Sequence, residues 1–102
     1  MNVEIDGGEG GAMGLQETLK ALADPVRRDI LQLLKDERRA AGDIAKQFRL
    51  SQATISYHLA QLREAGLVYE TREKNYIYYE LNTSVFEDVL LLIAQLKGNH
   101  HA

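Results

Sequence analysis

Apolar residues recur at helical spacing through most of the chain, and their phase predicts where each helix lies. One stripe falls three and four residues apart near the start of the chain: Leu15, Leu19 and Leu22. A second follows the pair Asp24-Pro25, in which aspartate is a good N-cap and proline suits the first helical position. Its members are Val26, Ile30, Leu33 and Leu34. The spacing predicts two short helices, the second ending at about residues 35–37.

Two further helices, joined by a tight turn, are predicted between residues 41 and 64. The first covers about residues 41–48, with Ile44, Ala45 and Phe48 turned inward. Ser51 is a natural N-cap for the second, which the pair Ala65-Gly66 ends. The second helix has one apolar stripe, made by Ile55, Leu59 and Leu62. Its other side carries polar, small, aromatic or cationic residues: Gln52, Ser56, Tyr57, Ala60 and Arg63.

A β-hairpin is predicted after these helices. Residues 67–72 and 76–81 are rich in β-branched and aromatic side chains, and a short polar tip separates them. Within the second strand Ile77, Tyr79 and Leu81 alternate with more polar positions, as in a half-buried strand. A helix-turn-helix followed by a hairpin indicates a winged helix-turn-helix fold. We therefore expect a mainly α domain with a β-hairpin wing, about five helices and two strands.

The last predicted helix begins at Thr83-Ser84, where Ser84 and Glu87 match a capping box. Its middle, residues 89–94, is apolar all round. A terminal helix in so small a domain cannot bury such a girdle against its own core, and the first helix also has an apolar face left over. We therefore expect a homodimer whose interface contains the following residues: Leu15, Leu19, Phe86, Val89, Leu90, Ile93 and Leu96.

The two ends of the chain differ in composition from this predicted domain. Residues 1–14 hold five glycines, so we expect a flexible tail there, followed by one domain over residues 15–97. Residues 98–102 are expected to be a disordered tail, in which His100 and His101 have no third ligand for a metal. The chain has no cysteine, which excludes disulfides and thiolate sites and fits a reducing cytoplasm. No cofactor or bound metal is expected, and no apolar run is long enough to span a membrane.

Positive charge is concentrated in the middle of the chain. The formal net charge is -3, and three acidic residues near the start carry that excess: Glu4, Asp6 and Glu9. Between residues 38 and 63 there is one acidic residue, Asp43, and there are five basic residues: Arg38, Arg39, Lys46, Arg49 and Arg63. A basic face on a near-neutral domain attracts phosphates, so double-stranded DNA is the expected partner.

The front of the helix over residues 51–64 carries side chains that suit base recognition in a major groove. Gln52 donates and accepts hydrogen bonds in one plane, which matches N6 and N7 of adenine. Ser56, one turn on, can bond a base edge or a phosphate, and Tyr57 can stack on a thymine methyl or donate its hydroxyl to a phosphate. Solvated surface helices carry such residues too, but the basic flanks and the wing favour DNA contact.

Candidate phosphate contacts lie around the helix-turn-helix and on the wing: Arg39, Lys46, Arg49, Arg72, Lys74 and Tyr76. Thr54 and His58 flank the groove face. For His58, a phosphate contact and a partly buried structural role are both open. Of Arg27 and Arg28, one is expected to pair with a carboxylate inside the domain.

Four segments together closely resemble the ArsR family of winged-helix repressors: LADPVRRDILQLL, AGDIAKQF, LSQATISYHLAQLREAGLV and R-x-x-x-YIYYEL. The match runs from about Leu19 to Leu81, and loosely to Leu96. The continuation LNTSVFED and the lack of metal ligands look most like the SdpR-like autorepressor subgroup. The resemblance implies a dimeric repressor with five helices and a two-stranded wing. It also implies that the fourth helix enters the major groove and that the wing touches the DNA backbone or minor groove.

The resemblance places the DNA-reading positions at Gln52, Ala53, Ser56 and Tyr57, and the dimer interface on the first and last helices. This chain departs from the family pattern in three places. Ala40 stands where many members have Thr or Ser before the third helix. The wing tip has Lys74 and Asn75 in place of a glycine. Metal-sensing members carry a cysteine pair or Asp/His pairs that this chain lacks, so metal sensing is not expected.

These observations favour a homodimeric, sequence-specific DNA-binding repressor that recognises an inverted-repeat operator through the helix at 51–64 and the wing at 71–76. A metal- or small-molecule-responsive sensor repressor is one alternative. A winged-helix protein-interaction module without DNA binding is another. An enzyme is not expected, because no nucleophile-and-base pair or phosphate-binding loop is present; Ser56 and His58, two apart on one helix, diverge by about 200°.

Overall fold

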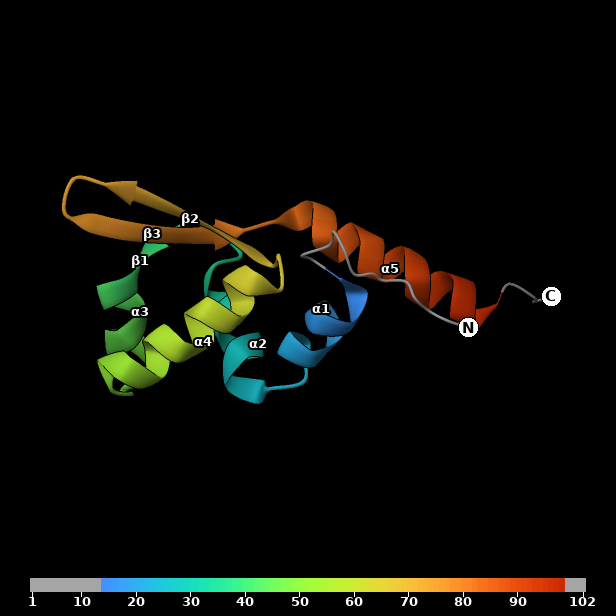
Figure 1. Cartoon of the computed structure of the whole chain (residues 1–102), viewed down its shortest axis with the longest axis horizontal. Helices are drawn as coiled ribbons and strands as arrows, with labels where there is room; N and C mark the ends of the chain where they lie inside the picture. Colours follow the sequence, from blue (N-terminus) through green and yellow to red (C-terminus); the bar gives the residue numbers. More distant parts are fainter. Residues whose placement is uncertain (1–13, 99–102) are drawn as a thin grey trace.

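The computed structural model describes residues 14–98, so the two predicted tails, with His100 and His101, lie almost entirely outside the described residues. Figure 1 shows the arrangement of the elements. The helices are α1 (Leu15–Leu22), α2 (Pro25–Leu33), α3 (Ala41–Phe48), α4 (Gln52–Glu64) and α5 (Thr83–Lys97). The strands are β1 (Arg39–Ala40), β2 (Val68–Glu73) and β3 (Tyr76–Leu81). The five helices and the hairpin confirm the predicted fold class.

The hairpin belongs to a three-stranded antiparallel sheet in the order β1-β3-β2. β2 and β3 pair along their whole length, from Val68 opposite Leu81 to Glu73 opposite Tyr76. β1 adds two residues to the other edge of β3, with Arg39 opposite Tyr79. The sequence pattern did not predict β1. Because β1 runs directly into α3, it attaches the base of the wing to the helix-turn-helix.

Two helices begin with the side-chain caps that the sequence predicts. The Asp24 carboxylate accepts hydrogen bonds from the backbone N–H groups of Val26 (2.8 Å) and Arg27 (3.1 Å) at the start of α2. The Ser51 hydroxyl accepts one from the N–H of Thr54 (3.1 Å) at the start of α4. α3 begins at Ala40 without a side-chain cap. Each cap contributes about 0.5–2 kcal/mol of stability, so the boundaries of α2 and α4 are well defined.

The start of α5 differs from the prediction. The N-cap is Asn82 and it makes no side-chain cap bond, so the capping box expected from Ser84 is wrong. Asn82 is buried, and its side-chain amide donates to the carbonyl of Gly66 (2.9 Å). Its backbone N–H donates to the carbonyl of Leu67 (2.9 Å). Asn82 therefore ties the start of α5 to the link between α4 and β2.

Two turns also carry corrections to the predicted details. α2 ends at Leu33, two residues before the predicted range. At the wing tip, where Lys74 and Asn75 replace the family's glycine, it is Lys74 that adopts the left-handed backbone conformation, with φ 55°. Gly66 has φ 78° after α4, in the role that the sequence predicts for it.

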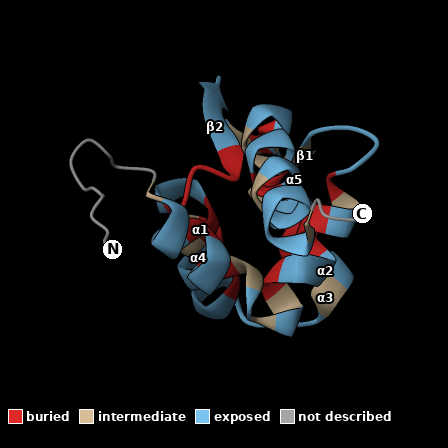
Figure 2. Cartoon of the chain, turned by 90° about the vertical axis from the view of Figure 1, so that its right-hand side faces the viewer, coloured by how far each residue is buried: buried red, intermediate tan, exposed pale blue. Residues whose placement is uncertain are grey.

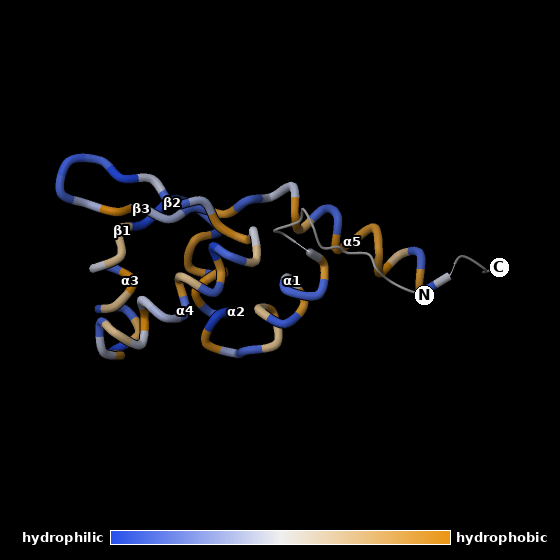
Figure 3. Tube along the Cα trace, in the orientation of Figure 1, coloured by the Kyte–Doolittle hydropathy of each residue, from blue (hydrophilic) through white to orange (hydrophobic). Residues whose placement is uncertain are grey.

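One hydrophobic core joins the helices to the base of the wing. Its most deeply buried side chains come from α2, α3, α4 and the link that follows α4: Ile30, Ile44, Ile55, Leu59, Leu62 and Leu67. In contrast, α5 leaves the body on the side opposite to the wing tip (Figure 1). Most of its surface is exposed (Figure 2), although apolar residues recur along it (Figure 3). Among residues 14–98, no helix is long and apolar enough to cross a membrane.

Candidate nucleic-acid interface

The two faces of α4 are the central feature of this surface. Ile55, Leu59 and Leu62 are at most 1% exposed and hold the helix to the core. The four positions assigned to base contact lie on the exposed side: Gln52, Ala53, Ser56 and Tyr57. Tyr57 is 57% exposed. The helix therefore has a fixed back and a free front, as its pattern predicts.

Ser51 and Thr54 fix the N-terminal end of this helix through their hydroxyl groups. Besides capping the helix, the Ser51 hydroxyl donates to the Thr54 hydroxyl at 2.9 Å. Thr54 is exposed, and its own hydroxyl proton is available to an outside acceptor such as a phosphate. The helix end that carries Gln52 and Ala53 is consequently ordered before any ligand arrives.

His58 lies on the buried side of α4. This position contradicts the phosphate contact considered for it and agrees with the structural role. The residue is 9% exposed, and its Nδ1 lies 3.3 Å from Nη1 of Arg27. A guanidinium only donates hydrogen bonds, so Nδ1 is the acceptor in this contact. The rings of Tyr57 and His58 meet edge to face with centroids 5.4 Å apart.

Arg27 is the interior arginine, but its partners differ from the expected carboxylate. Its Nε donates to the carbonyl of Ala21 at 2.9 Å, and Nη2 to that of Lys20 at 3.5 Å. Arg28 is exposed and donates to the carbonyl of Leu22 at 2.9 Å. The guanidinium of Arg27 thus links the end of α1 to the back of α4.

The positive charge around the helix-turn-helix is smaller than the sequence count indicates. Arg38 donates two hydrogen bonds to the carboxylate of Glu73, at 3.0 and 3.1 Å. Arg63 bonds Glu70 at 2.8 Å. Both carboxylates lie on β2, outside the stretch of 38–63 over which the charge was counted. Two of its five cations are therefore neutralised by the wing.

The ion pair with Arg38 also lowers the pKa of Glu73. The hydrogen bond and the charge of Arg38 hold the pKa of Glu73 below its usual value. The same hydrogen bonds, which Arg38 donates, in turn raise the pKa of Arg38. Glu73 is therefore a carboxylate at neutral pH, and Arg38 stays paired with it.

Three cations remain as phosphate candidates beside α4. Lys46 and Arg49 are exposed at the end of α3. Arg39 is half-buried in β1, where its Nη2 lies 3.9 Å from a carboxylate oxygen of Glu37. Within residues 14–98, its Nε has no hydrogen-bond partner. Lys46 and Arg49 are thus better placed for a phosphate than Arg39 is.

The remaining candidates for phosphate contact lie on the wing. Arg72, Lys74 and Tyr76 are all exposed, and Tyr76 is 58% exposed at the tip. Tyr79 is buried in β3, so it packs inside the domain, and burial raises its pKa. Figure 1 shows the wing tip and the N-terminal end of α4 at the same end of the molecule.

The residues assigned to the dimer interface fall into two groups. Five are exposed apolar side chains of α1 and α5: Leu15, Leu19, Leu90, Ile93 and Leu96. Leu91, which was not assigned, is exposed as well. Val89 is buried and Phe86 packs partly against the core, so one chain already covers much of these two.

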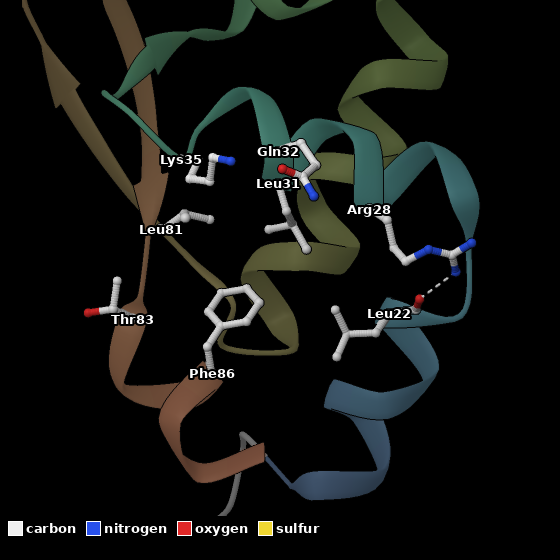
Figure 4. A pocket seen from close by; sticks show the side chains of 8 residues that line it. All are labelled: Leu22, Arg28, Leu31, Gln32, Lys35, Leu81, Thr83 and Phe86. Atoms are coloured by element: carbon white, nitrogen blue, oxygen red, sulfur yellow. Dashed lines mark hydrogen bonds between the residues drawn. The ribbon is translucent and has the colours of Figure 1, made fainter. Parts of the chain in front are cut away.

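A mainly apolar hollow of about 400 Å³ lies beside this face, between the end of α1, α2 and the start of α5. Its lining residues are Leu22, Arg28, Leu31, Gln32, Lys35, Leu81, Thr83 and Phe86. Figure 4 shows the Phe86 ring facing Leu31 and Leu22 across the hollow. No three His, Asp or Glu side chains within residues 14–98 gather closely enough to hold a metal.

Comparison with known proteins gives several similarities of fold and sequence. Residues 22–70 match a helix-turn-helix domain family. The transcriptional repressor SdpR of Bacillus subtilis is 45% identical over 74 residues, covering 72% of this chain and 82% of that protein. An arsenical resistance operon repressor of Staphylococcus aureus is 34% identical over 76 residues, covering 74% and 73%.

One similar protein of known structure is a homodimer. It is a homodimeric winged helix-turn-helix DNA-binding domain from Mycobacterium bovis, described as a possible ArsR-family regulator. It is 30% identical to this chain with a TM-score of 0.67, covering 86% of this chain and 84% of that one.

Proposed function

Since the chain belongs to the ArsR family of winged-helix transcriptional regulators, we propose that it represses transcription as a homodimer bound to an inverted-repeat operator. The observation that best supports this proposal is the difference between the two faces of α4. Its apolar side is sealed against the core, while Gln52, Ser56 and Tyr57 project from an ordered helix end. Such a helix can enter a major groove without any rearrangement of the domain.

Each exposed side chain of α4 suits a different part of the groove. Gln52 has the paired donor and acceptor that adenine requires. Ala53 offers a methyl to a thymine methyl, and Ser56 can bond either a base edge or a phosphate. Tyr57 stands at the margin of the helix, where its ring packs on a sugar or its hydroxyl reaches a phosphate. Sequence choice is therefore assigned to Gln52, Ala53 and Ser56, with Tyr57 beside them.

Phosphate contacts are assigned to cations on both sides of α4. Lys46, Arg49 and Thr54 flank the helix, with Arg39 a weaker candidate. Arg72, Lys74 and Tyr76 belong to the wing. Because Arg38 and Arg63 are already paired with wing carboxylates, we expect fewer released counterions than the number of basic residues implies.

The uncovered apolar face of α1 and α5 supports the proposed homodimer. Leu90, Ile93 and Leu96 are each at least 50% exposed, which is costly for large apolar side chains on a monomer. The apolar hollow at the start of α5 gives a second chain further surface to cover. A two-fold axis through this face would present two α4 helices about 34–36 Å apart, which is one turn of DNA.

The test is a binding assay with Gln52→Ala on a selected operator and on a scrambled duplex of the same composition. We expect a loss of about tenfold or more on the operator, since a bidentate base contact contributes roughly 1–3 kcal/mol of discrimination. Affinity for the scrambled duplex should change less than about twofold, because phosphate contacts are intact. Gln61→Ala, the same change at the other end of α4, is the control. An equal loss on both duplexes would remove Gln52 as a base reader.

A further inference from the structure

Arg38 joins the body of the domain to the far end of the wing. Its guanidinium makes two hydrogen bonds to the Glu73 carboxylate on β2, and its carbon lies 4.1 Å from the centroid of the Tyr78 ring on β3. One side chain thus contacts both strands of the hairpin. We call these three residues, Arg38, Glu73 and Tyr78, the wing clasp.

The position of the wing clasp matters because, within residues 14–98, β1 is the one strand outside the hairpin that supports it. β1 pairs with β3 at Tyr78 and Tyr79, and no strand lies on this edge of β3 from there to the tip. Glu73 is the last residue of β2, pairs with Tyr76, and directly precedes Lys74. A free two-stranded hairpin is only marginally ordered in water, so a contact at its last residue pair restrains the tip.

The chemistry of Arg38 suits this task better than a phosphate contact. Its planar fork matches the carboxylate with two parallel bonds while its face stacks on the Tyr78 ring, a combination that lysine cannot reproduce. A DNA phosphate would have to displace the Glu73 carboxylate, which already neutralises the charge of Arg38. Arg38 also directly precedes β1, which runs into α3, so its backbone is attached to the helix-turn-helix.

We propose that Arg38 is a positioning residue, which uses the wing clasp to hold Lys74 where it can reach a DNA phosphate while α4 occupies the major groove. This inference rests on the proposed DNA-binding function. It predicts that the contribution of Lys74 to DNA affinity depends on an intact clasp.

The experiment is a double-mutant cycle between Arg38→Lys and Lys74→Gln, measured as operator affinity over a range of salt concentrations. Arg38→Lys keeps the charge but removes the fork and the stacking. We expect Lys74→Gln alone to lower the salt slope by about 0.9, the value for one phosphate contact. In the Arg38→Lys background, Lys74→Gln should change neither affinity nor slope appreciably. Arg28→Lys, at an exposed arginine away from the wing, is the control background.

A direct phosphate contact by Arg38 gives the opposite pattern and would overturn the proposal. Arg38→Lys would then keep most of the affinity, Arg38→Gln would lower the slope, and the effects of Arg38 and Lys74 would add. Full additivity of Arg38→Lys with Lys74→Gln refutes the positioning role in the same way.

A measurement without DNA separates this inference from the proposed function. The chain has no cysteine, so Asn75→Cys gives a single site for a nitroxide label at the wing tip. The electron paramagnetic resonance spectrum should show a more mobile label in Arg38→Lys and in Tyr78→Leu than in the wild-type background. An unchanged spectrum in both would refute the clasp even if the protein binds DNA. Altered mobility with no operator binding would instead refute the proposed function and leave the clasp standing.

Discussion

At the scale of single residues, the pair formed by His58 and Arg27 shows how a polar contact can support a binding surface from behind. The imidazole accepts a hydrogen bond from a buried guanidinium whose other bonds go to the end of α1. The side chains proposed to read bases lie on the exposed face of α4, so this contact supports the helix from its buried face. The burial of His58 and its contact with Arg27 therefore indicate a structural role.

Replacing His58 tests this role. His58→Phe keeps a ring but removes the acceptor, so it leaves Nη1 of Arg27 buried without its partner. We expect a loss of about 1–3 kcal/mol in the free energy of unfolding, measured with urea. The salt slope of DNA binding should stay that of the wild type, because no phosphate contact is lost. A reduced slope with unchanged stability would restore the phosphate assignment.

Asp24 makes a pH-dependent contribution to stability. Slight burial raises the pKa of its carboxyl, but the hydrogen bonds from the N–H groups of Arg27 and Val26 outweigh this, so the pKa lies below the ordinary value of 3.8. A group with a lowered folded-state pKa stabilises the protein above the unfolded value and loses that effect as pH falls through the folded value. We expect Asp24→Ala to cost about 1 kcal/mol at pH 7.

The control for this prediction is the pH profile itself. Urea unfolding of the wild type and of Asp24→Ala should give free energies that converge as the pH falls below the folded-state pKa. A difference that stays constant into that acid range would mean that the carboxylate charge plays no part in the cap.

At the scale of elements, periodicity and caps were enough to locate most of the fold. Ser51 and Gly66 set the ends of α4 as predicted, because their effects are local. β1 was missed because two residues carry no periodicity. The bond from Arg38 to Glu73 joins residues 35 positions apart, so no local pattern could reveal it, and the local charge count overstated the free positive charge. The burial of His58 was left open because its spacing suited either face.

The start of α5 offers a direct comparison between the sequence pattern and the structure. Asn82→Ala should cost about 1–3 kcal/mol in urea unfolding, because the buried carbonyl of Gly66 loses the side-chain donor that it bonds at 2.9 Å. Ser84→Ala should change stability by less than about 0.5 kcal/mol, as expected of a surface position that forms no cap bond. The reverse order of the two losses would show that the capping box forms after all.

At the scale of the whole molecule, the wing tip and the N-terminal end of α4 lie at one end while α5 projects from the other (Figure 1). DNA contact and dimerisation are thereby assigned to separate surfaces. Joining two chains through α1 and α5 leaves both α4 helices free, as a two-fold operator requires. We therefore expect a mutation at the proposed interface to weaken DNA binding only through the loss of the dimer.

Leu96→Glu tests that relation. Leu96 is 76% exposed, so the substitution should leave the folded chain intact while placing a charge in the proposed interface. Sedimentation should show monomers at concentrations where the wild type is dimeric, and operator affinity should fall by at least about tenfold. Gln95→Glu adds the same charge at the neighbouring exposed position and serves as the control. A Leu96→Glu variant that remains dimeric would exclude this face.

The most direct test of the central claim is a footprint of the wild-type protein on the genomic fragment that it binds most tightly. A homodimer with one α4 helix in each major groove should protect two half-sites arranged as an inverted repeat, with those grooves about 10–10.5 base pairs apart or a multiple of that spacing. Methylation of purine N7 within those grooves should interfere with binding. A single asymmetric protected site, or protection that is the same on every fragment tested, would contradict the account.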